Sequence, residues 1–232
     1  MQSDIYDNKK IAKILVLGPP KAGKTTLCRF LADFMEESEG SKKGEDPAER
    51  ERKFEFEFTT TYMPTKAARI QEFETHEFFQ DAEHETRRLQ DSEIHLWDVS
   101  GDRKYEDCWP AIKENVEGVI LVANPEEHKG KDLQLWYTEF VEKENINLNC
   151  VMVILNEQGS KKTNHEQISS FEILPQLRTV HHVAHHFGSE SMQMKQEVNA
   201  FMASVLRVDQ RRAEMAESHG LSYEEAPEED EF

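Results

Sequence analysis

The sequence predicts a single α/β domain in which a mainly parallel central sheet is covered by helices on both faces. Apolar strand patterns alternate with helical patterns along most of the chain, an arrangement typical of parallel sheets. A glycine-rich motif joins the first predicted strand to the first predicted helix. The chain has 232 residues, which suits one domain with insertions better than two independent domains.

The elements are predicted from their apolar patterns. Residues 11–17 form an apolar, β-branched run bounded by glycine and proline, which indicates a buried strand. A helix is predicted over residues 24–35, because Leu27, Phe30 and Leu31 recur at helical spacing. Further strands are expected at residues 69–79, 93–97, 118–123, 150–155 and 179–183, the first two as a hairpin. Further helices are expected at residues 103–115, 131–143, 165–177 and 189–206.

The folded domain is expected to span residues 10–206, with an insertion at about residues 36–58. The insertion is predicted from its composition, which is charged, of low complexity, and includes glycine and proline. Residues 207–232 are predicted to form an acidic, disordered tail, because residues 224–231 contain six acidic side chains in eight.

The composition limits the classes of partner. The formal net charge of −18 argues against nucleic acid and anionic lipid surfaces, because phosphate binding needs lysine and arginine. Three widely spaced cysteines indicate a reducing compartment and no disulfide framework. No stretch predicts a membrane span or a signal peptide, and neither residue 2, a glutamine, nor the C-terminal end predicts lipidation. We therefore expect protein partners and no direct membrane anchor.

Residues 18–25 match the phosphate-binding pattern G-x-x-x-x-G-K-[ST], directly after a strand and directly before a helix. Backbone N–H groups of such a P-loop surround phosphate oxygens, and the helix N-terminus adds partial positive charge. We expect Lys24 to reach the β- and γ-phosphates and Thr25 to ligate Mg²⁺. The loop is unusual at Pro20, which has no N–H to donate, and at Lys21, which would crowd the γ-phosphate.

Two further motifs follow in the order of a nucleotide-dependent switch. Asp98 ends an apolar strand and opens the pattern W-D-x-x-G, so it is expected to hold Mg²⁺ through water while the Gly101 N–H meets the γ-phosphate. Upstream, Thr65 is predicted to complete the Mg²⁺ coordination, with the threonines at 59–61 as alternatives. The predicted nucleotide-binding residues are Gly18, Lys21, Ala22, Gly23, Lys24, Thr25, Thr26, Thr65, Gly101 and Asn156, and the predicted metal ligands are Thr25, Thr65 and Asp98.

Two elements of a GTPase are degenerate in this sequence. The base-reading pattern N-K-x-D is replaced at residues 156–159 by Asn-Glu-Gln-Gly, and Gly159 cannot accept hydrogen bonds from guanine. A preference for guanine over adenine is therefore inferred from the switch motifs alone. Asp102 stands at the catalytic position where a glutamine would orient the attacking water. Its carboxylate is repelled by the γ-phosphate, so hydrolysis is expected to be slow unless a partner supplies catalytic groups.

Some aromatic and histidine side chains allow two interpretations. Trp109 is either a core residue or, because it follows the second switch, an exposed partner contact. The apolar stripe of the helix at 131–143 is expected to pack on the sheet. Four histidines are expected to be solvated loop residues after a strand rather than a metal site: His181, His182, His185 and His186.

The order of these motifs resembles the Rab-like five family of small G proteins, within the Ras-like superfamily. The resemblance covers residues 10–206 and rests on residues 62–65, 97–111 and 136–140 and on the degenerate motif that ends at Gly159. It implies a Ras-like P-loop G domain that binds GTP or GDP with Mg²⁺ and acts as an adaptor subunit of the intraflagellar transport B complex. It also implies docking on coiled-coil subunits of that complex, in the cytoplasm and in the cilium or flagellum and its base.

Two other functions stay open at this point. A pseudo-G-protein would keep the fold and the partner without nucleotide control. A P-loop nucleotide kinase would need an arginine-bearing lid, which the sequence does not show, and would leave the motifs at 62–65 and 98–101 unexplained.

If the triphosphate state is constitutive, the surface near Thr65 and Trp109 is expected to receive a helical partner.

Overall fold

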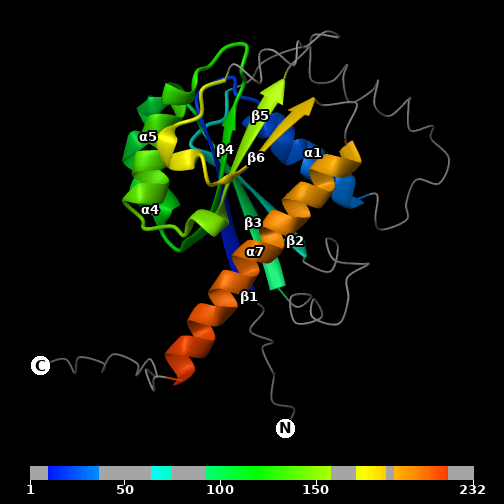
Figure 1. Cartoon of the computed structure of the whole chain (residues 1–232), viewed down its shortest axis with the longest axis vertical. Coiled ribbons are helices and arrows are strands. Elements are labelled where there is room, and N and C mark those ends of the chain that lie inside the picture. Colours follow the sequence, from blue (N-terminus) through cyan, green and yellow to red (C-terminus); the bar gives the residue numbers. More distant parts are fainter. Residues whose placement is uncertain (1–9, 37–63, 75–91, 158–170, 187–190, 219–232) are drawn as a thin grey trace, which may run out of the picture.

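The centre of the fold is a six-stranded sheet with the strand order β2-β3-β1-β4-β5-β6 (Figure 1). The computed structural model describes residues 10–36, 64–74, 92–157, 171–186 and 191–218. The strands are β1 (Lys10–Leu17), β2 (Ala68–Glu74), β3 (Ser92–Val99), β4 (Val116–Ala123), β5 (Val151–Glu157) and β6 (His181–His186). Only β2 runs antiparallel, paired with β3 as the predicted hairpin. The predicted fold class, a mainly parallel sheet with helices on both faces, is confirmed.

Helical segments connect the strands. The longer helices are α1 (Lys24–Glu36) and α7 (Ser191–Ser218). Between β3 and β5 lie shorter segments, many of them a single turn. These are η2 (Arg103–Cys108), α4 (Trp109–Lys113), η3 (Gly130–Leu133), α5 (Gln134–Tyr137), the π-helical η4 (Thr138–Glu142) and η5 (Leu148–Cys150), and η6 (Pro175–Leu177) precedes β6.

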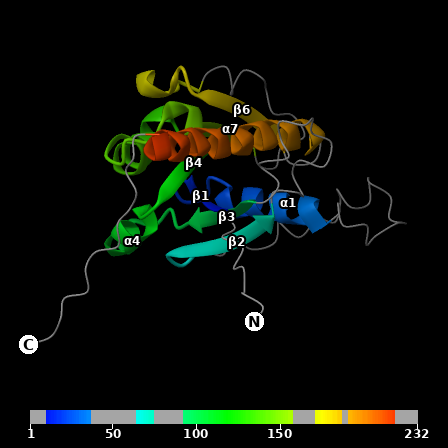
Figure 2. The ribbon, with the colours of Figure 1, turned by 90° about the horizontal axis from the view of Figure 1, so that it is seen from below.

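Each face of the sheet has its own apolar core. Helices α1 and α7 cover one face, where Leu27, Leu31 and Met202 are buried with the inward side chains of the strands. Helices α4 and α5 cover the other face, where Trp136 and Phe140 are buried, so the predicted packing of the 131–143 stripe is confirmed. Seen from below, α1 lies beside β2 and β3, and α7 lies beside β4 and β6 (Figure 2).

The parallel register places the carboxyl ends of β1, β3, β4 and β5 at the same edge of the sheet. β1 pairs in parallel with β3 on one side and β4 on the other, and β4 pairs in parallel with β5. Because the carboxyl ends of parallel strands share an edge, the loops after these strands lie together. The phosphate-binding loop, Asp98, Asn124 and Asn156 therefore all lie at this edge, each at the end of a different strand or directly after it.

Helix α7 extends beyond residue 206, the predicted end of the folded domain. The sequence predicts a disordered tail from residue 207, but α7 continues to Ser218. Val205 and Leu206 are buried, so the core holds the helix at the point where the polar composition begins. Residues 219–232 and most of the predicted insertion, from residue 37 on, lie outside the described residues.

Two helix predictions are wrong in part. In the described part of the helix predicted at 165–177, residues 171–174 are not helical and only Pro175–Leu177 forms a 3-10 turn. Pro175 has no N–H for a helical hydrogen bond and disfavours helix at the residue before it. The helix predicted at 103–115 is divided into η2 and α4, which begins at Trp109. Pro110 lies in the first turn of α4, where its missing N–H costs no helical hydrogen bond, so it favours a new helix start there.

The structure decides between the two interpretations of Trp109 in favour of the core, and it corrects the expectation for the four histidines. Trp109 is only 7% exposed and belongs to the core, so it is not an exposed partner contact. The four histidines lie within β6 and not in a loop after a strand, because residues 181–186 pair with β5. β6 begins two residues later than predicted and ends at His186.

Candidate nucleotide-binding site

The loop between β1 and α1 has the backbone shape that its glycines require. At Gly18, with φ 148°, an added Cβ would lie 2.1 Å from the Val122 carbonyl oxygen, so no larger residue fits. Gly23 also has a positive φ, at 90°. Lys21 adopts a left-handed φ of 62°, although it is not a glycine. This conformation strains the backbone next to Pro20, the other unusual residue of the loop.

The side chain of Lys24, the first residue of α1, lies inside the phosphate-binding loop that precedes the helix. Its ammonium group donates hydrogen bonds to the carbonyl oxygens of Gly18, at 2.9 Å, and Pro19, at 2.8 Å. The side chain is 6% exposed. Desolvation lowers the pKa of Lys24 to about 8, and the nearby carboxylate of Asp98 opposes this change. A buried cation of this kind gains most from an anionic ligand such as phosphate.

Three oxygen-bearing side chains from separate elements meet beside Lys24. The hydroxyl groups of Thr25, in α1, and Thr65, before β2, donate to Asp98 Oδ2 at 2.7 and 3.1 Å. The two hydroxyl oxygens are 3.0 Å apart. Asp98 is fully buried, and its Oδ1 has no hydrogen-bond partner among the described residues. Two hydroxyls and a buried carboxylate are the hard oxygen donors that Mg²⁺ prefers, so the predicted metal ligands fit that ion.

The second switch approaches the loop at Gly101. A Cβ atom at Gly101 would lie 2.5 Å from Pro20 N and 2.6 Å from the Pro19 carbonyl carbon, so glycine is required for the contact. Asp102 follows, but its carboxylate accepts a hydrogen bond from Lys104 N at 3.1 Å and pairs with Lys104 Nζ at 2.6 Å. The hydrogen bond from the Lys104 side chain lowers the pKa of Asp102. Asp102 is therefore the N-cap residue of η2.

Asn156, at the end of β5, contacts the phosphate-binding loop through its side-chain amide. Its Nδ2 donates to the Ala22 carbonyl oxygen at 3.2 Å. Asn156 is fully buried, and its Oδ1 has no hydrogen-bond partner in the described part of the chain. Thr26 lies in the first turn of α1, half-buried. Gly159, like residues 59–63 of the first switch, lies outside the described residues.

One contact to the loop was missed in the sequence. His128, after β4, places its Nε2 3.0 Å from the Pro20 carbonyl oxygen. No motif includes this histidine, and only the return of the 124–128 turn to the sheet edge shows its role.

In the described part of the chain, the candidate metal-binding group outside this site is Glu72, Glu93 and His95.

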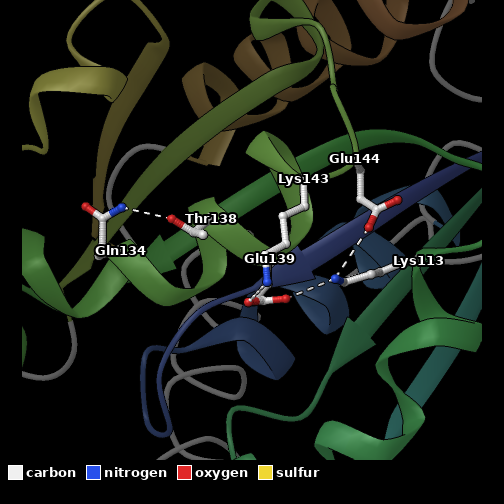
Figure 3. A network of polar contacts seen from close by, with 6 residues as sticks. All are labelled: Lys113, Gln134, Thr138, Glu139, Lys143 and Glu144. Atoms are coloured by element: carbon white, nitrogen blue, oxygen red, sulfur yellow. Dashed lines mark hydrogen bonds and ion pairs between the residues drawn. The ribbon is translucent and has the colours of Figure 1, made fainter.

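The helix after the second switch is tied to the α5 side by a polar network (Figure 3). Lys113, in α4, pairs with Glu139 at 3.1 Å and Glu144 at 3.4 Å, and Lys143 also pairs with Glu139. Hydrogen bonds from Lys143 and Lys113 lower the pKa of Glu139. This network connects α4 to the π-helical segment η4 and to Glu144 just after it.

The three cysteines, all within the described residues, form no disulfide. Cys28 and Cys150 are buried, and burial raises the pKa of the Cys28 thiol. Cys108 is partly exposed at the junction of η2 and α4. Within the described residues, no helix is both long and apolar enough to cross a membrane.

The sheet order, the phosphate-binding loop and the Thr25–Thr65–Asp98 group define a Ras-like small GTPase domain. In agreement, the family "Ras of Complex, Roc, domain of DAPkinase" matches residues 50–159. "Intraflagellar transport associated protein 2" of Caenorhabditis elegans is 74% identical over 99% of this chain and 93% of its own length. An "Intraflagellar transport protein 22 homolog" of Danio rerio is 30% identical over 88% of this chain and 96% of its own. The chain belongs to the intraflagellar transport protein 22 family of small GTPase-like proteins, as the predicted resemblance implies.

Solved structures show the same fold. The GTP-bound crystal structure of T. brucei IFT22/74/81 has a TM-score of 0.61 at 23% identity, covering 88% of this chain and 99% of the other. The GDP-bound crystal structure of T. brucei IFT22 has a TM-score of 0.56 at 23% identity, covering 86% and 98%. At this identity the match concerns the fold. The nucleotide-kinase interpretation has no support in the fold or the family.

Proposed function

We propose that this chain binds GTP or GDP with Mg²⁺, hydrolyses GTP slowly, and acts as an adaptor subunit of the intraflagellar transport B complex. The observation that carries the proposal is the meeting of Thr25, Thr65 and Asp98 beside the buried ammonium group of Lys24. Three segments that are distant in sequence contribute one polar group each to this point. A buried carboxylate with an unpartnered oxygen favours a cation there.

Each residue of the site has a distinct part in this proposal. Lys24 binds the β- and γ-phosphates, and the N–H groups of the loop and of Gly101 surround them. Thr25 and Thr65 ligate Mg²⁺ through their hydroxyl groups, and Asp98 holds it through water. The bound ion neutralises charge on the phosphate oxygens. The remaining phosphate-binding residues of the loop are Gly18, Lys21, Ala22, Gly23 and Thr26.

Slow hydrolysis follows from the position of Asp102. Its carboxylate is engaged by Lys104, and it cannot orient a water molecule as a glutamine amide would. Intrinsic turnover is expected at or below about 10⁻⁴ per second, the scale of an unassisted Ras-like protein. The triphosphate state would then persist for hours wherever GTP is abundant.

Guanine selectivity is expected to be weak. Asn156 supports the loop through Ala22, but Gly159 offers no carboxylate to the guanine N1 and N2 groups. The loss of this charge-assisted pair of hydrogen bonds should remove about 2–4 kcal/mol of discrimination. Competition between GTP and ATP tests this point, and a thousandfold preference for GTP would mean that another residue recognises the base.

The adaptor role is supported by the names of the relatives. Two of them are described as intraflagellar transport proteins, and a T. brucei protein of the same fold is described in a structure with IFT74 and IFT81. We propose coiled-coil subunits of the transport complex as partners, in the cytoplasm and in the cilium or flagellum and its base. The net charge of −18 opposes binding to nucleic acid and to anionic membranes.

The decisive experiment is to identify the nucleotide that co-purifies with the full chain. The protein is denatured, and the released nucleotide is separated by ion-exchange chromatography. GDP or GTP is expected from the wild type and from the conservative variant Thr25→Ser. Much less is expected from Lys24→Ala and Thr25→Asn, which remove the phosphate-binding charge and a Mg²⁺ ligand. A folded wild type that carries no nucleotide and binds none in Mg²⁺ buffer would favour the pseudo-G-protein.

A further inference from the structure

The turn after β4 presents one side chain to the phosphate-binding loop. Asn124 is 2% exposed and organises this turn. Its carbonyl oxygen accepts from Glu127 N at 3.1 Å and from His128 N at 2.8 Å. Its side-chain Oδ1 accepts from Glu126 N at 2.9 Å. The turn is therefore held by three hydrogen bonds that do not use the imidazole ring of His128.

The ring of His128 makes two hydrogen bonds whose directions indicate its tautomer. Asn124 N can only donate, so His128 Nδ1, at 3.1 Å, is the acceptor. The Pro20 carbonyl oxygen can only accept, so His128 Nε2, at 3.0 Å, is the donor. A neutral imidazole with its proton on Nε2 satisfies both. The first bond orients the ring, and the second connects residues that are 108 positions apart.

The carbonyl that His128 holds belongs to the most unusual peptide of the loop. The Pro20 carbonyl and the Lys21 N–H are parts of one planar peptide group, and in a trans peptide they point in opposite directions. Pro20 contributes no N–H of its own. Lys21 has a left-handed φ of 62°, a conformation that is costly for a residue with a side chain. An external contact that fixes this peptide therefore offsets strain and sets the direction of the Lys21 N–H.

Other carbonyl groups of the loop are held by residues of the predicted motifs. Lys24 binds those of Gly18 and Pro19, and Asn156 binds that of Ala22. The Pro20 carbonyl is held from outside these motifs, by His128.

We propose that His128 is a positioning residue of the nucleotide site, which holds the Pro20–Lys21 peptide so that the Lys21 N–H faces the bound phosphates. This proposal rests on the proposed nucleotide binding. In this role His128 compensates for the two residues, Pro20 and Lys21, that make the loop unusual. It does not touch the nucleotide itself.

The test measures the dissociation rate of fluorescently labelled GDP from the full chain in Mg²⁺ buffer. Glutamine can place an amide N–H near the position of Nε2, so His128→Gln should retain the wild-type rate within about twofold. Asparagine can replace Nδ1 as the acceptor for Asn124 but is too short to reach Pro20. His128→Asn and His128→Ala should therefore release GDP about three- to tenfold faster, the effect of one hydrogen bond. His182→Ala, in which an exposed histidine of β6 is lost, is the matched control.

The contrast between glutamine and asparagine separates positioning from folding. Both variants lose the ring, so a purely structural role predicts equal rates for the two and parallel losses in thermal stability. Equal rates for all five proteins would overturn the positioning role and leave the proposed function intact. A Gln variant as fast as the Ala variant would also overturn it. If the wild type binds no GDP, the proposed function fails first and the role of His128 fails with it.

Discussion

Removing Trp109 should destabilise the whole domain. Its side chain is 7% exposed and lies against two other rings, with centroid distances of 5.6 Å to Trp136 and 5.1 Å to Phe140. Truncation of a buried tryptophan to alanine costs about 3–5 kcal/mol, from lost burial and the cavity that remains. For a chain of this size, each kcal/mol lowers Tm by about 2–4 °C, so Trp109→Ala should lower it by about 6–20 °C.

The assays are urea unfolding for the free energy and thermal unfolding for Tm, both followed by far-UV circular dichroism, since the substitution itself removes a fluorophore. Nucleotide and Mg²⁺ concentrations are kept equal for all variants, because bound ligand raises apparent stability. Trp109→Phe retains an aromatic ring in the cluster and should lose less. Ile70→Ala, at a side chain that is 45% exposed, is the surface control and should change stability by less than about 1 kcal/mol.

A loss below about 1 kcal/mol for Trp109→Ala would refute the core assignment, because no large cavity would have formed. The expected large loss has a practical consequence. Reduced capture of a partner by Trp109→Ala would report unfolding, and it could not be interpreted as a lost contact with that partner. Trp109 lines a pocket together with Pro110, Leu135 and Glu139. The surface near Trp109 is therefore tested better by a substitution of Pro110, which is exposed.

Three further predictions concern the switch, the packing of α7 and the α4 network. Thr65→Ala should weaken Mg²⁺-dependent GTP binding by at least about tenfold with a smaller effect on GDP, and Thr65→Ser should restore it, as measured by titration calorimetry. Gly118→Ala should lower the unfolding free energy by about 1–3 kcal/mol, because the new Cβ would lie 2.8 Å from Val205 Cγ2. Because the folded-state pKa of Glu139 is lowered, its stabilising effect is present above the ordinary carboxyl pKa and is lost as pH falls through the lowered value. Glu139→Gln should flatten the decrease in urea midpoint below about pH 4.5, and an unchanged pH profile would contradict the ion pairs.

The strands and the phosphate-binding loop could be predicted because their signals are local. β1, β4 and β5 each contain an apolar run that is buried on both faces, and such runs are recognisable within a few residues. The group of Thr25, Thr65 and Asp98 could be predicted because each residue belongs to a short motif and the motifs occur in a fixed order. The parallel register of β1 and β3 then brings the P-loop and Asp98 to the same edge.

The features that could not be predicted depend on contacts between distant segments. His128 has no local pattern, and its role depends on a carbonyl 108 residues away. Trp109 was ambiguous because an aromatic residue after a switch suits a core or a surface equally, and only the aromatic cluster around Phe140 decides. The histidines of β6 form no apolar strand pattern, yet pairing with β5 extends the strand to His186. The helical end at Ser218 is not predictable from composition, because a polar segment suits a solvated helix as well as a disordered tail.

The distribution of the cysteines makes the protein suitable for site-specific labelling. A thiol reacts as the accessible thiolate, and burial protects Cys28 and Cys150 in the folded state. Only Cys108 is open to a maleimide dye, and it lies between the second switch and α4. A dye at this position would report rearrangement of the switch during nucleotide exchange without any engineered residue. Reaction at all three thiols would in turn measure the fraction of molecules that have unfolded.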